Sequence, residues 1–350
     1  MFAPFCKLAD PHNYVACPWN LSTDAEARVY WVDRFKTHLE TILNLGIAAG
    51  ISRGIDAASL LARAGQCRIE FADKFDEFKT EPRKCGQVTI LTLDRWRDRI
   101  LRHHGFVDAF LDHKSKANAE VLPQLAGVCR ELDETPEPER MRQVIRGVFA
   151  GNISDMGADA VISKLLAGGH DFHSTLRNIR PRPWLIDDLD AWEKRIATGP
   201  PHRKAVFFVD NAGSDFVLGV VPMMRWLARR GTRVVLAANE RPTLNDMTIT
   251  DVKIWWPMLT AAAPSLVGLP IEIVSTGTGE PLIDLAEVST ELNKAAADAD
   301  LVILEGMGRA VESNLEARFS CEALNVAMIK DEMVARRLGG GMFDLVFRYR

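Results

Sequence analysis

The amino-acid sequence predicts an α/β protein in which a helical first half precedes a mostly parallel sheet. From about residue 24 to residue 167, apolar residues recur at spacings of three and four, the period of an amphipathic helix. After residue 201, short runs rich in β-branched residues alternate with helical stretches, and these runs show little alternation of polar and apolar residues. Strands that are apolar on both faces are typical of a parallel sheet that helices cover on both sides.

The helical half contains several amphipathic stretches. The longest covers residues 25–50, and the same periodicity returns at residues 91–106, 118–132 and 138–151. Almost no β-rich run interrupts these stretches, so we interpret this half as a helical bundle or a cap. A proline-punctuated segment at residues 180–192 joins it to the second half.

Six strands are predicted in the second half, each a short apolar run. They cover residues 205–209, 233–238, 271–274, 301–304, 326–329 and 345–349. The helical stretches between them cover residues 215–231, 246–259, 289–299 and 330–340. Gly231 and Gly339 come just after pairs of arginines, and glycine after basic residues is a common helix end.

Composition argues against several classes of function. The chain has 350 residues, is 47% apolar and 26% charged, and carries a net charge of −4, so we expect no nucleic-acid or membrane partner. No run approaches the roughly 20 apolar residues that span a bilayer, and the N-terminus lacks the pattern of a secretion signal. The scattered cysteines are typical of reduced thiols in a cytoplasmic protein. A homo-oligomer is left open.

Polar residues follow the predicted strands at the edge where ligands of open parallel sheets bind. Asp210 and Asn211 follow the first strand, and Asn245 and Asp246 lie a few residues beyond the second. Later strand ends carry Glu305, Gly306, Gly308, Arg309 and Lys330. Because the carboxyl ends of parallel strands meet at one edge, we expect these residues to converge there.

The acidic and amide residues among them suit a metal ion. Asp210, Asn211 and Asp246 offer hard oxygen ligands without histidine or thiolate, which favours Mg²⁺, Mn²⁺ or a similar divalent ion. Two crowded carboxylates raise each other's pKa unless a cation lies between them, so a metal is their natural partner.

The glycines and cations suit a phosphate group. Gly306 and Gly308 let backbone N–H groups approach an anion, Arg309 can hold phosphate oxygens bidentately, and Lys330 adds a point charge. A metal that activates water and cations that stabilise a developing phosphoryl charge together indicate phosphate ester hydrolysis.

Each of these residues also has a structural interpretation. Asp210 and Asn211 are good caps for a helix that starts near Asp215. When these two residues are considered without the others, helix capping is as good an interpretation as metal binding. From the sequence alone, Asn152 and Asp155 are best interpreted as a turn between two helices. The concentration of acids, amides, glycines and cations on one edge favours a phosphate or nucleotide site over independent caps.

Four stretches resemble the damage-control phosphatases, once called domain-of-unknown-function family eighty-nine. They are residues 208–248 (FVDNAGSDFVLG and onward), 300–340 (DLVILEGMGRAVESN and onward), 145–157 (IRGVFAGNISDMG) and 178–192 (NIRPRPWLIDDLDAW). The EGMGR at 305–309 is similar to the signature of one subgroup. That subgroup contains the phosphatase domain fused to eukaryotic pantothenate kinases and its stand-alone plant relatives. The resemblance covers roughly residues 90–350.

The resemblance implies a three-layer α/β/α sandwich with a mostly parallel sheet and an N-terminal helical domain. We therefore predict an N-terminal arm at 1–22, a helical domain at 23–185 and an α/β/α metal-binding catalytic domain at 186–350. It also implies hydrolysis of phosphate monoesters of small metabolites, in this subgroup 4′-phosphopantetheine and its oxidised or damaged forms.

The resemblance further implies the roles of the site residues. Asp210, Asn211 and Asp246 would hold a divalent metal ion, Mn²⁺, Co²⁺, Ni²⁺ or Mg²⁺, and Asp210, Asp246 and Lys330 would be catalytic. The substrate or phosphate contacts would be Asn152, Asp155, Asn245, Glu305, Gly306, Gly308, Arg309, Asn314 and Lys330. Two positions depart from the family pattern, Ser154 and Asp331, and neither is a proposed metal ligand.

Our mechanistic hypothesis is that the metal ion binds a substrate phosphate oxygen and orients or deprotonates a water for in-line attack. Covalent attack by a carboxylate is the alternative, but enzymes of the haloacid dehalogenase type carry a second acid where this chain has Ala212. Three functional alternatives remain: a sugar-phosphate phosphatase of the same family, a nucleotide- or methyl-donor-binding transferase, and a binding protein without turnover.

Overall fold

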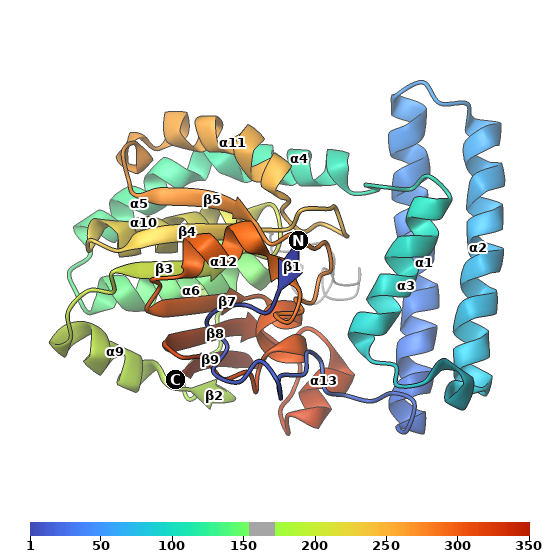
Figure 1. Cartoon of the computed structure of the whole chain (residues 1–350). Coiled ribbons are helices and arrows are strands. Elements are labelled where there is room, and N and C mark those ends of the chain that lie inside the picture. The colour runs from blue at the N-terminus through green and yellow to red at the C-terminus, as the bar shows by residue number, and fades with distance from the viewer. Residues whose placement is uncertain (154–171) are drawn as a thin grey trace.

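The structure, a computed structural model, describes residues 1–153 and 172–350. Its centre is a seven-stranded sheet in the order β2–β9–β8–β7–β3–β4–β5 (Figure 1). The strands are β2 (Ile186–Asp187), β3 (Lys204–Phe208), β4 (Arg233–Ala238), β5 (Ile271–Ser275), β7 (Leu301–Glu305), β8 (Glu322–Met328) and β9 (Leu345–Tyr349). Neighbouring strands are parallel except β8 and β9. The predicted α/β fold with a mostly parallel sheet is confirmed.

The sheet separates two hydrophobic cores. Along the central strand β3, Ala205 and Phe207 face one core while Val206 and Phe208 face the other, and all four are fully buried. Burial on both faces explains why this strand shows no alternation of polar and apolar residues.

Helices on the two faces complete the three layers (Figure 1). One face packs against α5 (Leu125–Glu134), α6 (Glu139–Ile153), α9 (Leu189–Thr198), α10 (Val221–Arg229) and α11 (Ile249–Ala262). The other face packs against α12 (Thr290–Ala296), α13 (Glu332–Arg337) and the N-terminal arm. The arm is fastened by its strand β1 (Phe2–Ala3), which pairs with β6 (Val288–Ser289).

Three helices, α1 (Ala25–Ser52), α2 (Ala57–Thr80) and α3 (Ile90–His103), stand together beside the sheet (Figure 1). The side chain of Asp24 caps α1 by accepting from the Ala27 N–H. The apolar stripe of α1 packs on α2, where the rings of Phe35 and Phe75 stack at 5.6 Å between centroids. We call these three helices the helical unit.

Helix α4 (Leu111–Val121) leads from the helical unit back to the sheet (Figure 1). Because α5 and α6 pack on the sheet and not on the helical unit, the helices expected within residues 23–185 do not form one bundle. The domain boundaries at residues 22 and 185 stay predictions.

Several short elements were not predicted from the sequence. They are the strands β1, β2 and β6, the helix α8 (Phe172–Arg177), and the 3₁₀ turns η1 (Pro82–Cys85), η2 (Leu122–Gln124) and η4 (Pro264–Leu266). The ordinary helix expected from residue 215 opens with the π-type turn η3 (Asp215–Val220), and a second such turn, η5 (Met307–Ser313), follows β7. Within residues 1–153 and 172–350, no helix has the length and apolar character needed to cross a membrane.

Candidate active site

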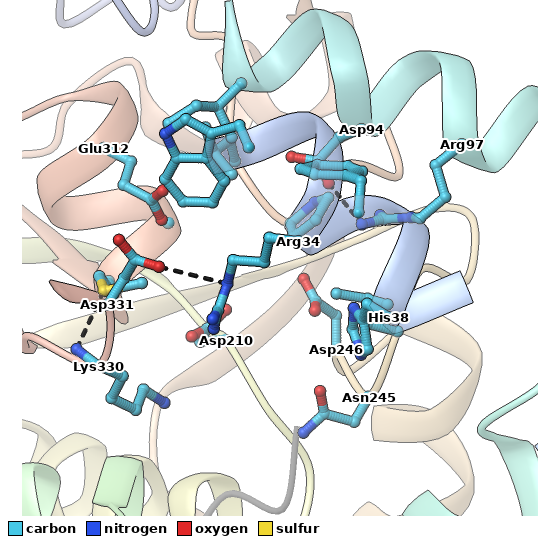
Figure 2. A pocket seen from close by; sticks show the side chains of 18 of the residues that line it. Arg34, His38, Asp94, Arg97, Asp210, Asn245, Asp246, Glu312, Lys330 and Asp331 are labelled. Atoms are coloured by element: carbon cyan, nitrogen blue, oxygen red, sulfur yellow. Dashed lines mark hydrogen bonds and ion pairs between the residues drawn. The ribbon is translucent and has the colours of Figure 1, made fainter. Parts of the chain in front are cut away.

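A cavity of about 500 Å³ lies between the carboxyl edge of the sheet and the helical unit (Figure 2). Its sheet side includes the predicted residues Asp210, Asn211, Asn245, Asp246, Gly308 and Lys330. Its helical side includes Tyr30, Trp31, Arg34, Phe35 and His38 of α1 and Asp94 and Arg97 of α3. The strand ends therefore converge on one cavity, and a second wall covers them that the sequence did not predict.

Main-chain contacts join the loops that follow β3 and β4. Asn211 and Asp246 form an isolated antiparallel bridge. The Met247 N–H donates to the Asp210 carbonyl at 2.9 Å. Since Asp210, Asn211 and Asp246 are all nearly buried, adjacent parallel strands hold these three side chains in a defined arrangement away from bulk water.

Arg309 links the two aspartates. Its Nη1 pairs with Oδ1 of Asp210, and its Nη2 donates to Oδ2 of Asp246 at 2.6 Å. The guanidinium is only 1% exposed, and Asn239 Nδ2 also donates to Asp246 Oδ2, at 3.2 Å. Arg309, predicted as a phosphate contact, thus contacts the carboxylates directly.

A second acidic group lies deeper and shares Asp210. One oxygen each of Asp210, Asp215 and Glu305 lies within 4.8 Å of the others. Asn152 Nδ2 donates to Asp215 Oδ2 and to Glu305 Oε1, both at 3.1 Å. Burial, with the charges of Asp215 and Asp210 nearby, raises the pKa of Glu305 well above its usual range. We call Asp210, Asp215, Glu305 and Asn152 the inner cluster.

This donor chemistry fits a divalent cation. Asp210, Asn211 and Asp246 offer oxygen donors of the kind that hard divalent ions bind, and the two carboxylates already hold one buried positive charge. In the inner cluster, Asn152 Oδ1 is buried and has no hydrogen-bond partner within residues 1–153 and 172–350. An acceptor oxygen in that position suits a nearby cation.

The glycines of the EGMGR segment make room for other groups. Gly306 has a φ of 90°, and a Cβ there would collide with the carboxylate of Asp210. A Cβ on Gly308 would lie 2.7 Å from the Pro281 carbonyl oxygen. The Gly306 N–H donates to the Val326 carbonyl, so this glycine admits the Asp210 side chain and does not offer its own N–H to an anion.

The remaining predicted contacts lie in different places. Lys330 lines the cavity, and its Nζ donates to the Asn152 carbonyl at 2.8 Å. Asn314 is buried away from the cavity lining, where its Nδ2 donates to the Ile283 carbonyl at 3.0 Å. Asp155 lies outside the described residues.

The helical wall carries polar residues that sequence reasoning missed. Tyr30 Oη donates to Asp331 Oδ2 at 2.8 Å, and Arg34 Nε pairs with the same oxygen at 3.2 Å. Tyr30, Arg34 and His38 are spaced four residues apart along α1, beside the apolar stripe of Trp31 and Phe35. A polar stripe next to the buried face of an amphipathic helix is the signal that could have revealed this wall.

The buried Asp94 and the half-buried Glu312 lie in the upper part of the cavity (Figure 2). Asp94 pairs with Arg97 at 2.6 Å, and burial raises the pKa of Asp94 to about 7 in spite of this pair. Desolvation and the charges of Asp331 and Asp94 raise the pKa of Glu312 to about 8, although Arg34 acts in the opposite direction.

The Glu312→Gln variant is expected to lose less stability than the wild type as the pH rises. The pKa of Glu312 rises from 4.5 in the unfolded chain to about 8 in the folded protein, so folding retains a proton that the unfolded chain releases. Its contribution to stability is complete below pH 4.5 and is lost as the pH rises through 8. Urea unfolding at both ends of this interval measures the difference.

Glu316→Gln is the matched control, because Glu316 lies nearby in sequence but is 70% exposed and pairs with Arg348. This control should keep the wild-type pH dependence. A Glu312→Gln protein with the wild-type pH dependence would contradict the assignment of the raised pKa.

Comparison with known proteins gives consistent results. The sequence model of the damage-control phosphatase ARMT1-like domain matches residues 51–346. A damage-control phosphatase of Arabidopsis thaliana is 34% identical over 362 residues, a match that covers 99% of this chain and 96% of that protein. Pantothenate kinase 2 of the same plant is 36% identical over 383 residues. The 4′-phosphopantetheine phosphatase of Mus musculus is 31% identical over 396 residues.

The matches differ in how much of each relative they cover. They cover 99% and 98% of this chain but only 41% of the plant kinase and 48% of the mouse phosphatase. This chain therefore spans less than half the length of those two relatives. Among solved structures, a DUF89 family protein from Pyrococcus horikoshii is similar with a TM-score of 0.63 and 17% identity. That match covers 91% of this chain and 96% of the other, and it supports the fold.

Proposed function

The chain belongs to the damage-control phosphatase ARMT1-like domain family, and from this premise we propose that a divalent metal ion binds Asp210, Asn211 and Asp246 at the cavity floor. The protein is a phosphatase, a phosphoric monoester hydrolase of small metabolites. One observation carries the site assignment: carboxylates from the loops that follow two different strands, β3 and β4, hold the same buried cationic group. Two acids placed in this way can also share a metal ion.

The proposed reaction divides its work between the metal ligands and Lys330. A divalent ion held by Asp210, Asn211 and Asp246 would supply Lewis-acid charge and would lower the pKa of a water. Asp210 and Asp246 fix the position of that charge, and Lys330 places its ammonium group on the cavity wall, where it can neutralise a phosphate oxygen.

The contacts of Asp210 support attack by water over attack by a carboxylate. Its Oδ1 pairs with Arg309, and its Oδ2 accepts from Asn211 Nδ2 at 2.8 Å. A carboxylate with both oxygens engaged by donors is a weak nucleophile and a well-oriented ligand.

For the substrate we propose 4′-phosphopantetheine or its oxidised or damaged forms. The mouse relative bears the name of a 4′-phosphopantetheine phosphatase. The cavity combines charged residues at the sheet edge with the apolar side chains of Trp31, Phe35, Ile90 and Leu282. Such a mixed lining suits a phosphate head that is attached to a longer organic chain. The cytoplasmic location and the choice among Mn²⁺, Co²⁺, Ni²⁺ and Mg²⁺ stay predictions.

Metal removal tests this proposal. Protein stripped with a chelator is expected to lose turnover of phosphate esters, and one or more of Mn²⁺, Co²⁺, Ni²⁺ and Mg²⁺ should restore it. The panel contains 4′-phosphopantetheine, its disulfide and sulfonate forms, sugar phosphates and p-nitrophenyl phosphate. Full turnover by protein that elemental analysis shows to be metal-free would contradict the metal site. A higher kcat/KM on sugar phosphates would instead support the sugar-phosphate alternative.

A further inference from the structure

We propose that Glu70, His103 and His104 of the helical unit bind a divalent transition-metal ion, at a site separate from the candidate active site. Glu70 lies in the middle of α2, whereas His103 is the last residue of α3 and His104 follows it. The three residues line a surface hollow, and within the described part of the chain its lining shares no residue with that of the active-site cavity. The inference does not depend on the proposed phosphatase function.

The three side chains converge on one point. His103 Nδ1 lies 3.0 Å and His104 Nε2 lies 2.7 Å from the same oxygen, Oε2 of Glu70. An ion about 2.0–2.1 Å from each ligand would hold neighbouring ligand atoms about 2.9 Å apart in a six-coordinate site and about 3.3 Å apart in a tetrahedral one. Because the side chains of His103 and Glu70 are 69% and 43% exposed, a small rotation can open the present separations to these values.

Two imidazole nitrogens and one carboxylate oxygen form a donor set that transition metals favour. Imidazole suits Zn²⁺, Cu²⁺ and Ni²⁺, whereas Mg²⁺ and Ca²⁺ prefer sites made of oxygen alone. Three protein ligands also leave at least one coordination position for water, as in many zinc sites. Asp210, Asn211 and Asp246 offer only oxygen donors, so the two sites would favour different ions.

The charges around the site favour a cation. The two histidines lie at the C-terminal end of α3, which is the negative end of the helix dipole. Asp73 and Glu77 line the same hollow as Glu70. Among the described residues, Lys74 is the only lysine or arginine of that lining, and its ammonium group pairs with Glu77 at 3.0 Å. The hollow therefore has an excess of negative charge that attracts a divalent ion.

An ion bound here would brace the helical wall of the active-site cavity. It would join α2 to α3, and α3 carries Asp94 and Arg97 in the cavity lining. Asp94 and His103 are about 13 Å apart along the helix axis. The ion would thus stabilise the folded helical unit without contacting a molecule in the cavity, because it binds a site that only the folded chain assembles.

Zinc binding by variants of the three ligands tests the inference. The full-length protein is compared with His104→Gln and Glu70→Gln, and bound Zn²⁺ is counted by equilibrium dialysis and elemental analysis. His12→Gln is the matched control, because His12 is also exposed but belongs to neither group of metal-ligating side chains found among the described residues. Asp210→Asn, which removes a proposed ligand of the active-site metal, separates the two sites. Circular dichroism of each metal-free variant verifies that it is folded.

His104→Gln and Glu70→Gln should each lose about one equivalent of bound Zn²⁺, because two protein ligands hold an ion too weakly. Asp210→Asn should keep this equivalent, and His12→Gln should bind Zn²⁺ like the wild type. In NMR spectra of the wild type, Zn²⁺ should shift the ring nitrogen signals of His103 and His104 and leave that of His12 in place. Zn²⁺ should also raise the thermal unfolding midpoint of Asp210→Asn, and this shift should be lost when His104→Gln is added.

Two results would overturn the metal site. One is an unchanged number of bound Zn²⁺ ions in both His104→Gln and Glu70→Gln. The other is complete loss of Zn²⁺ binding in Asp210→Asn, which would place all of the bound zinc at the active site. Zinc that shifts the histidine signals but not the unfolding midpoint of Asp210→Asn would overturn the bracing role.

Discussion

Replacing Asp210 by asparagine is expected to lower kcat/KM of the metal-loaded protein by about 10³-fold or more, because a catalytic metal contributes several kcal/mol to transition-state stabilisation. Asp210 belongs to both groups of oxygen donors. It shares the Arg309 guanidinium with Asp246, and it is also a member of the inner cluster. Its loss therefore affects a metal in either place. Kinetics with saturating Mn²⁺ and 4′-phosphopantetheine measure the effect, and calorimetry should show weaker binding of Mn²⁺.

Asp33→Asn is the matched control for this variant. Asp33 also lines the cavity, but its side chain is 56% exposed and pairs with Lys79 on α2. Its replacement should change kcat/KM by no more than about threefold, as is usual for an exposed site. Wild-type metal affinity in Asp210→Asn would show that the metal ligands lie elsewhere.

The positions of the strands follow from sequence because each central strand is apolar on both faces. Phe207 and Phe208 of β3 face opposite cores, so the run has no polar position and is recognised as a buried parallel strand. The same topology explains why the sequence alone predicts that Asp210 and Asp246 lie close together. They follow β3 and β4, which are adjacent and parallel, so their strands end at the same edge.

The sequence contains a signal for the inner cluster, but it predicts other roles for Glu305 and Asp215. Leu301, Ile303 and Glu305 of β7 share one face by strand alternation, and that face packs against α6. This explains why Glu305 meets Asn152 of α6 in the inner cluster and does not line the cavity. The sequence pattern predicts only a helix start at Asp215, yet its side chain belongs to the same cluster.

Other features depend on tertiary packing. Asp215 and Arg309 lie on the π-type turns η3 and η5. Over a single turn, a π-helix and an α-helix have nearly the same spacing of apolar residues, so the sequence pattern does not distinguish them. Arg34 reaches the site because the helical unit stands over the sheet edge, and its partner Asp331 is almost 300 residues further along the chain. No local pattern encodes a contact over that sequence separation.

Replacing Arg309 by methionine is expected to lower the free energy of unfolding of the metal-free protein by about 3–5 kcal/mol, the usual cost of breaking a buried ion pair. The variant leaves the carboxylates of Asp210 and Asp246 buried without the guanidinium that both contact. A divalent ion can supply the missing positive charge, so saturating Mn²⁺ should stabilise Arg309→Met more than it stabilises the wild type. Urea unfolding with and without Mn²⁺ measures both quantities.

Arg95→Met separates this effect from the general loss of an arginine. Arg95 forms three ion pairs, with Glu280, Asp284 and Glu287, but its side chain is 38% exposed. Solvent screens such pairs, so the expected loss is below about 1 kcal/mol and should not depend on Mn²⁺. If Arg309→Met were as stable as the wild type without metal, the two aspartates would not need a cation between them. Equal stabilisation of both proteins by Mn²⁺ would place the metal away from Asp210 and Asp246, since only an ion held by those carboxylates can replace the charge of Arg309.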